Sequence, residues 1–296
     1  MKKLLGVLVL AVAGTACQHH APPVATATVR KLPAPPAAAA PPAAVAKLPL
    51  LFAAADTLVA PMRQLLQTYD LSALWQNADD SDNNPTFEGF FGPDHYHFAM
   101  VFSQVKRDAD NPTRYYVLGK CRYRKNIRPF SGTLTVRQIA GLAYPGFLQA
   151  VAISDSNAAD SVAGRTYTAR AQLQLREETK ENSGIFEGEV LLDFYVVPSR
   201  PVGYVRVYNH EGIEPSLPTR GSGLLLQGNR LNVSTGQVKS FTVGPWLAAV
   251  APNVYKDFML DERMGQINPK YAKLGWNEHW ENDEWWAATP KPKLSL

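Results

Sequence analysis

Four tryptophans near the C-terminus form the densest group of chemically versatile residues in the chain. Trp276, Trp280, Trp285 and Trp286 fall within eleven residues and are interleaved with Glu278, Glu281, Asp283 and Glu284. Tryptophan rings stack on the apolar faces of sugars, and carboxylates accept hydrogen bonds from sugar hydroxyls, so the segment is a candidate ligand-binding platform. The same rings could instead cover one end of a folded domain, because tryptophan combines a large apolar surface with one polar N–H. We favour the packing interpretation.

These carboxylates also raise the alternative of a glycan-active hydrolase. Glycoside hydrolysis needs two carboxyl groups at a fixed separation across a cleft. Exposed acids near a chain end rarely meet that condition. The sequence also contains no Walker loop, nucleophile elbow or helical pair of zinc-binding histidines. We therefore predict no catalytic residue and expect no cofactor.

A basic face is predicted around Cys121. Lys120, Arg122 and Arg124 alternate with Cys121 and Tyr123, so in a strand the three cations share one face. If that face looked into a barrel, the cations would form an anion-binding site. Because the apolar residues occupy the opposite face, we favour an outward, solvated orientation. Cys121 then reads as a buried structural thiol.

Metal binding has one weak candidate. Asp80, Asp82 and Asn84 have the first three spacings of a calcium-binding loop. An EF-hand is excluded, because Pro85 replaces the required glycine and Phe91 replaces the bidentate acid. An irregular calcium site remains an alternative to a solvated turn, which we favour.

A second pair of potential metal ligands lies shortly after that loop. His95 and His97 stand two residues apart, so in a strand they would share one face. A metal site would need a third ligand, and the sequence identifies none.

The N-terminus has the three parts of a secretory signal. Lys2 and Lys3 precede the apolar residues 4–13, and small residues end at Ala16 before Cys17. This segment resembles the signals of bacterial lipoproteins, whose cysteine is lipidated and becomes the mature N-terminus. The resemblance implies a lipidated Cys17 and a protein anchored to the bacterial cell envelope, at the outer membrane. An ordinary signal peptide cut after Ala16 is the alternative.

The remaining organisation follows from composition. After the signal, residues 1–16, we expect a lipidated cysteine and disordered tether over residues 17–50, where proline and alanine predominate. Apolar residues at helical spacing predict a short helical segment within residues 51–75. An all-β domain over residues 76–286 and a flexible tail over residues 287–296 complete the chain.

Strict alternation of apolar and polar residues predicts antiparallel strands with one buried face. The longest alternating runs cover residues 95–102, 115–124, 133–137, 167–176, 186–196, 202–208, 223–233 and 238–243. We predict an all-β fold in which an antiparallel meander forms a barrel or a strongly coiled sandwich, with the short helix at its N-terminal side.

Glycines recur two residues after a phenylalanine near predicted strand starts. Gly89, Gly132 and Gly188 follow this pattern, which suits strands that must bend sharply. The resulting architecture loosely resembles small-ligand barrels of the lipocalin and avidin type. Separate stretches over residues 115–133, 183–188 and 271–276 resemble β-rich bacterial lipoproteins of unassigned function. That resemblance implies a fold and no activity.

Length and charge limit the classes of function. A chain of 296 residues with 46% hydrophobic residues can bury a large core. Its formal charge of +4 includes Lys2 and Lys3 of the signal, and this balance does not indicate nucleic-acid binding. The leading hypothesis is non-catalytic binding or scaffolding in the envelope, of a glycan, a small ligand or an envelope protein. A structural subunit without a pocket is a further alternative.

Overall fold

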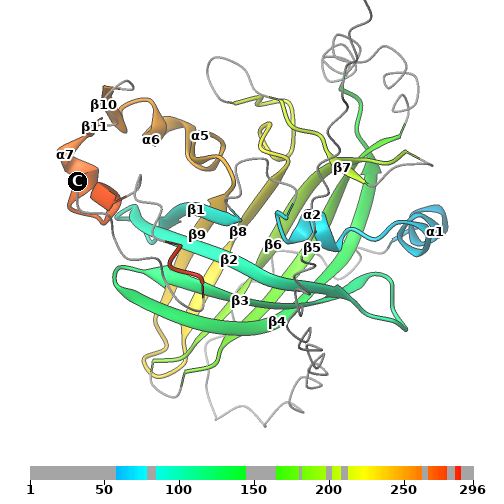
Figure 1. Ribbon diagram of the computed structural model, residues 1–296, viewed down its shortest axis with the longest axis horizontal. Coiled ribbons are helices and arrows are strands. Elements are labelled where there is room, and N and C mark those ends of the chain that lie inside the picture. The colour runs from blue at the N-terminus through cyan, green and yellow to red at the C-terminus, as the bar shows by residue number, and fades with distance from the viewer. Residues whose placement is uncertain are drawn as a thin grey trace, which may run out of the picture. The chain divides into compact units, whose positions relative to one another are not determined.

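The alternating segments form strands that close into an antiparallel barrel (Figure 1). The computed structural model describes residues 58–78, 85–144, 165–179, 182–197, 202–207, 213–261, 266–278 and 284–287. The signal, Cys17, the tether, the loop with Asp80, Asp82 and Asn84, and Trp280 lie outside the described residues, as does the tail beyond residue 287.

Each barrel strand pairs with the next, and the last pairs with the first. The eight barrel strands are β1 (Thr86–Phe91), β2 (Tyr96–Arg107), β3 (Arg114–Tyr123), β4 (Asn126–Gly141), β5 (Thr166–Glu177), β6 (Gly184–Tyr195), β8 (Leu224–Asn232) and β9 (Val238–Gly244). The short β7 (Gly203–Tyr204) pairs with the end of β6. Closure comes from antiparallel pairing of β1 with β9, in which Glu88 lies opposite Gly244 and Phe91 opposite Phe241. The barrel alternative of the predicted fold is therefore confirmed.

Apolar side chains of the alternating runs fill the barrel interior. Phe98, Met100 and Phe102 of β2 and Leu173 and Leu175 of β5 all belong to one buried cluster. Burying this much apolar surface is the dominant favourable contribution to folding. The prediction that the apolar residues of these strands share one buried face is confirmed.

Glycines allow neighbouring strands and bulky side chains to approach closely. A Cβ at Gly132 would lie 2.0 Å from the Gln174 carbonyl oxygen, and one at Gly188 would lie 2.2 Å from the Gln227 oxygen. Neither glycine has a positive φ, so left-handed backbone strain does not explain why glycine is needed there. Gly132 also lies well inside β4 and not at its start. These positions exclude a Cβ because a neighbouring backbone fills its place.

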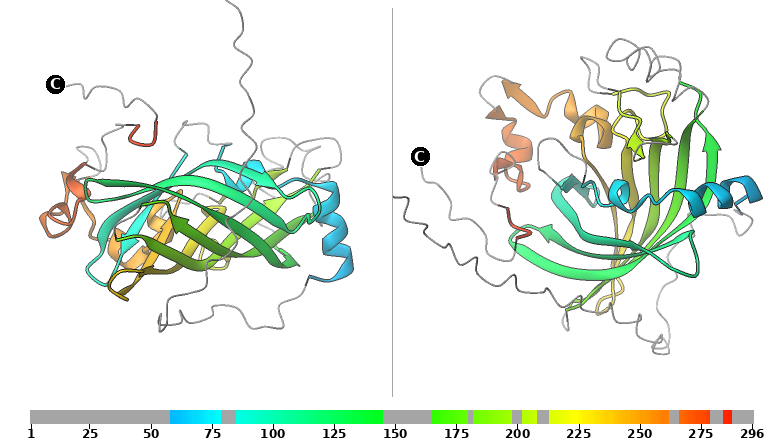
Figure 2. Two further views of the ribbon diagram at one scale, coloured as in Figure 1. Left: turned by 90° about the horizontal axis from the view of Figure 1, so that it is seen from below. Right: turned by 45° about the vertical axis from the view of Figure 1, so that its right-hand side comes forward.

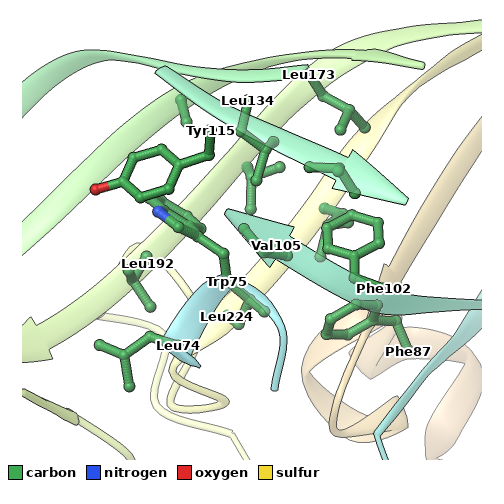
Figure 3. Packing of buried hydrophobic residues seen from close by; sticks show 14 of the residues in the cluster. Leu74, Trp75, Phe87, Phe102, Val105, Tyr115, Leu134, Leu173, Leu192 and Leu224 are labelled. Atoms are coloured by element: carbon green, nitrogen blue, oxygen red, sulfur yellow. The ribbon is translucent and has the colours of Figure 1, made fainter. Parts of the chain in front are cut away.

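Two helices close one end of the barrel. Helix α1 (Ala60–Thr68) and helix α2 (Ser72–Trp75) fall within the segment predicted to be helical. Trp75 of α2 is buried and packs edge-on against Tyr115, with ring centroids 6.1 Å apart (Figure 3). The Tyr204 hydroxyl donates to the Leu74 carbonyl oxygen, and Arg107 Nη1 donates to the Leu66 oxygen over 2.8 Å. Aromatic and aliphatic side chains therefore fill this closed end.

The chain after β9 packs on the outside of the barrel (Figure 2). Its elements are α5 (Leu247–Val250), α6 (Pro252–Tyr255), β10 (Met259–Asp261), β11 (Gln266–Ile267), α7 (Pro269–Ala272) and the 3-10 turn η1 (Trp276–Glu278). Their apolar residues form a second core with Phe90 of β1 and Leu225 of β8. Phe90 and Leu225 are thus outward-facing strand residues that this C-terminal layer buries.

Helices of the described part of the chain are all too short or too polar to span a bilayer.

Candidate functional site

Trp276 is a packing residue. Its side chain is fully buried, and its ring lies close to those of Phe90, His97 and Phe258, at centroid distances of 5.1, 4.3 and 4.9 Å. Its Nε1 donates to the His95 carbonyl oxygen over 3.0 Å. A ring enclosed in this way presents no free face to a sugar. For Trp276, the structure matches the packing interpretation and not the ligand platform.

His97 ties this C-terminal layer to the barrel wall. Its backbone N–H donates to the Leu274 oxygen over 2.9 Å, and its Nδ1 lies 3.1 Å from the Gly275 oxygen. Its Nε2 bonds to the Glu88 carboxylate. His95 lies in the turn before β2, with φ +57°, so the two histidines do not form the expected strand face. Among the described residues, no three potential ligands lie close enough together to hold a metal ion.

The last described segment, residues 284–287, joins two groups that the sequence suggested separately. Trp285 is buried against Ala99 and Val101 on the outer face of β2. The Arg122 guanidinium lies 5.1 Å from the Trp285 ring centroid, and Lys120 Nζ donates to the Trp286 carbonyl oxygen over 2.7 Å. Lys120 and Arg122 therefore face outward, which is the orientation that the sequence favours. The hydrogen bond from Lys120 also helps to hold Trp285 and Trp286 against the barrel wall.

Trp285 and Trp286 do not form a flat surface. Their ring planes are inclined by 86° at a centroid distance of 5.8 Å. Trp286 is only partly buried, whereas Trp285 is 4% exposed. A stacking platform needs coplanar exposed rings, so this pair packs on the wall.

Arg124 departs from the predicted basic face. Strand β3 ends at Tyr123, and Arg124 lies in the following turn with φ +58°. Its guanidinium lies over the rings of Tyr96 and Tyr123, at 4.8 and 5.3 Å from their centroids. The turn thus directs Arg124 toward an aromatic surface beside the barrel rim.

A cavity of about 700 Å³ lies between the barrel wall and the C-terminal layer, and we call it the outer groove. Its charged and polar lining includes Arg122, Arg124, Lys125, Lys273 and Asn277. Tyr96 and His97 also line it. Of its described lining residues, four are Lys or Arg and none is an acid. Two of the three cations proposed from the sequence therefore contribute to a concave basic surface.

The barrel end opposite α2 carries a polar cluster that the sequence analysis missed. Glu177 is buried there and accepts from Arg128 Nη1 over 3.0 Å, and from Arg230 Nε and Nη2 over 3.0 and 2.7 Å. Both arginines also donate to the Asn182 oxygen, and the Gly184 N–H donates to Glu177 over 2.8 Å. Burial alone would raise the pKa of Glu177, but Arg230 and Arg128 outweigh it and hold that pKa below its ordinary value.

Cys121 lies beside this cluster, and its thiol is unreactive. Its Sγ is 3.8 Å from Glu177 Oε1. Burial and the nearby Glu177 charge raise the pKa of the thiol far above its ordinary value. Because the thiolate is the reactive form, this cysteine is structural, as the sequence analysis favoured.

The alternation of inward and outward residues along the strands could have identified the polar cluster. Leu173 and Leu175 face inward, and Glu177 continues the same alternation at the end of β5. Arg128 likewise shares parity with the inward Phe130 of β4. A charge at an inward position of a strand end indicates a polar barrel mouth.

Comparisons with protein-family models, curated proteins and solved structures find no significant match to this chain. Functional inference therefore depends on the geometry of the outer groove and of the barrel mouth.

Proposed function

We propose that this protein is a lipid-anchored, non-catalytic binding protein of the bacterial envelope, and that its outer groove binds an acidic glycan. The observation that carries the proposal is the charge of the groove. Arg122, Arg124, Lys125 and Lys273 line it, and no acid is among its described lining residues. Such a surface attracts a polyanion, and salt weakens that attraction.

The groove also offers an aromatic wall. Tyr96 lines it, and Tyr96 and Tyr123 pack edge to face with centroids 5.8 Å apart. Carboxylate or phosphate groups of a glycan would pair with the cations, while a sugar ring would contact the tyrosine. The Arg122 guanidinium, which lines the groove, also lies over the Trp285 ring, so Trp285 supports the groove from the neighbouring wall and does not itself form the platform.

Binding of oligogalacturonate, a defined polyanionic sugar, tests the proposal. The Lys125→Gln/Lys273→Gln double variant should weaken binding at least tenfold, which corresponds to about 1.4 kcal/mol. Both lysines are exposed, so the substitutions should leave the fold intact. Lys256→Gln, directly after α6, is the matched control, because Lys256 is exposed and does not line the groove.

Three outcomes would contradict this assignment. The first is equal binding of a neutral oligosaccharide of the same length. The second is unchanged affinity in the double variant. The third is binding that appears only when Glu281 and Asp283 are replaced. In that case, acids of the chain itself would occupy the groove in the unmodified protein.

The proposed anchor has its own test. Cys17→Ser removes the thiol that would be acylated, so the protein should move from the detergent phase to the aqueous phase or remain unprocessed. Continued partitioning of Cys17→Ser with membrane would show that another segment holds the protein there.

The hydrolase alternative gains no support from the outer groove or from the barrel mouth. The outer groove has no acid among its described lining residues, and the lining of the mouth includes one carboxylate, Glu177. A carboxylate fixed by two arginines with a lowered pKa is a poor general acid.

A further inference from the structure

We propose a second, independent site in the mouth of the barrel, which binds a small organic carboxylate. A cavity of about 250 Å³ opens at the end where the β3–β4, β5–β6 and β8–β9 turns lie. Phe91, Phe98 and Cys121 contribute its apolar lining. Arg128 and Arg230 lie at the same cavity, so apolar and cationic surfaces face one small space.

The charge of this mouth favours an anion. Its described lining contains three cations, Arg128, Arg230 and Lys239, and one acid, Glu177. Glu177 neutralises only part of this charge. Lys239 Nζ lies over the rings of Phe91 and Tyr123, at 5.6 and 5.9 Å, and forms no ion pair within the described part of the chain.

The arginines are held in place before any ligand arrives. Glu177 and the Asn182 carbonyl oxygen accept from both guanidinium groups. These bonds use Nη1 of Arg128 and Nε and Nη2 of Arg230. Nη2 of Arg128 and Nη1 of Arg230 make no bond to other described residues. Fixed donors lose little conformational freedom when they bind, which favours affinity.

The size of the cavity selects a small ligand. Drug-sized molecules occupy pockets of roughly 300–1,000 Å³, and this space lies below that range. The phenylalanines of the barrel core close it from within, since Phe98 also packs against Phe186 and Phe241. A molecule with one carboxylate and one compact apolar part, of about the size of benzoate, fits both the charge and the volume.

Calorimetric titration of the intact chain with benzoate tests this site. Benzoate should bind with a stoichiometry of one, and benzamide, its neutral counterpart, should bind at least tenfold more weakly. Lys239→Gln should weaken benzoate binding at least tenfold. Lys125→Gln, in the outer groove, should leave it unchanged, so failure here is distinguishable from failure of the glycan proposal.

A second variant separates recognition from folding. Arg128→Lys retains the positive charge beside Glu177 but removes the free edge of the guanidinium, so benzoate binding should fall while thermal unfolding stays close to that of the unmodified protein. Four results would overturn the proposal: no benzoate binding, equal binding of benzamide, unchanged binding in Lys239→Gln, or binding of inorganic phosphate without binding of benzoate.

Discussion

Two buried carboxylates lie near opposite ends of the barrel and are stabilised by different means. Glu177 at the mouth is held by two arginines, and its pKa is lowered. Asp193, on β6 near the closed end, has no ion pair among the described residues and accepts from Thr168 Oγ1, Thr219 N and Thr219 Oγ1, over 2.6, 3.0 and 2.5 Å. Burial raises the pKa of Asp193, although these hydrogen bonds oppose the shift.

The difference shows that burial alone does not decide the charge of a carboxyl group. The mouth concentrates cations around Glu177 and keeps that acid ionised, whereas the donors to Asp193 are the neutral groups of Thr168 and Thr219. A charged, preorganised mouth suits a ligand. The closed end, with Trp75 and Tyr115, is built for packing.

Removing the buried ring of Trp75 from the closed end should have the largest effect on stability. Trp75→Ala deletes a fully buried ring at the closed end and should lower the free energy of unfolding by about 3–5 kcal/mol. Urea denaturation measures it. Tyr123→Ala at the mouth is the comparison, and it should cost less because Tyr123 is only partly buried. Equal losses would show that the two ends do not differ in packing.

Replacing each of the two carboxylates by its amide should change the free energy of unfolding by different amounts. Glu177→Gln leaves two arginines without their buried counter-charge and should cost about 3 kcal/mol of unfolding free energy. Asp193→Asn replaces a carboxyl whose charged form burial already disfavours and should cost about 1 kcal/mol. Chemical denaturation at pH 7 gives both values, and a reversed order would refute the contrast.

Substitution of glycine should depend on the space around each Cβ. Gly132→Ala places a methyl group against the Gln174 carbonyl oxygen and should cost about 1–3 kcal/mol, as overpacking does. Gly141→Ala, at the end of the same strand, meets nothing within 4 Å and should be neutral within about 0.5 kcal/mol. Melting temperatures of the two variants decide whether close approach explains these glycines.

The smallest expected effect is the dependence of the unfolding free energy on pH. Because the folded pKa of Glu177 is lowered, its stabilisation is present above its unfolded value near 4.5 and is lost as pH falls below it. Because the folded pKa of Asp193 is raised, its contribution is present below about 3.8 and is lost as pH rises through the folded value.

Unfolding free energies measured from pH 3 to pH 7 test both signs. Relative to the unmodified protein, Glu177→Gln should lose less stability on acidification. Asp193→Asn should lose less stability as pH rises. Parallel curves for all three proteins would contradict the opposite directions of the two shifts.

Local pattern predicted most of the barrel, because burial of one strand face imposes period two on the sequence. The inward positions of β2 and β5 follow directly from residues such as Phe98 and Leu173. The choice between a closed barrel and a sandwich did not follow from the pattern, since the β1–β9 pairing that closes the barrel joins residues far apart in the chain. The polar cluster of the mouth does not follow from the pattern either, because Arg128 and Arg230 meet Glu177 only after β4, β5, β6 and β8 have paired.

The outward basic face of β3 follows in part from the sequence. Lys120 and Arg122 were placed on one outward face by alternation, and the structure places them so. Their meeting with Trp285 depends on the path of the chain after β9, which alternation does not specify. Arg124 was misplaced because a turn with positive φ interrupts the strand pattern.

The pairing of β1 with β9 also has a kinetic consequence. Until β9 has formed, β1 has one edge whose N–H and C=O groups lack partners, and such an edge can pair with another chain. Contacts between distant parts of a sequence form slowly, because a long loop must close first. We expect closure to be a late folding step, during which an emerging chain is most exposed to aggregation and benefits most from chaperones that shield strand edges.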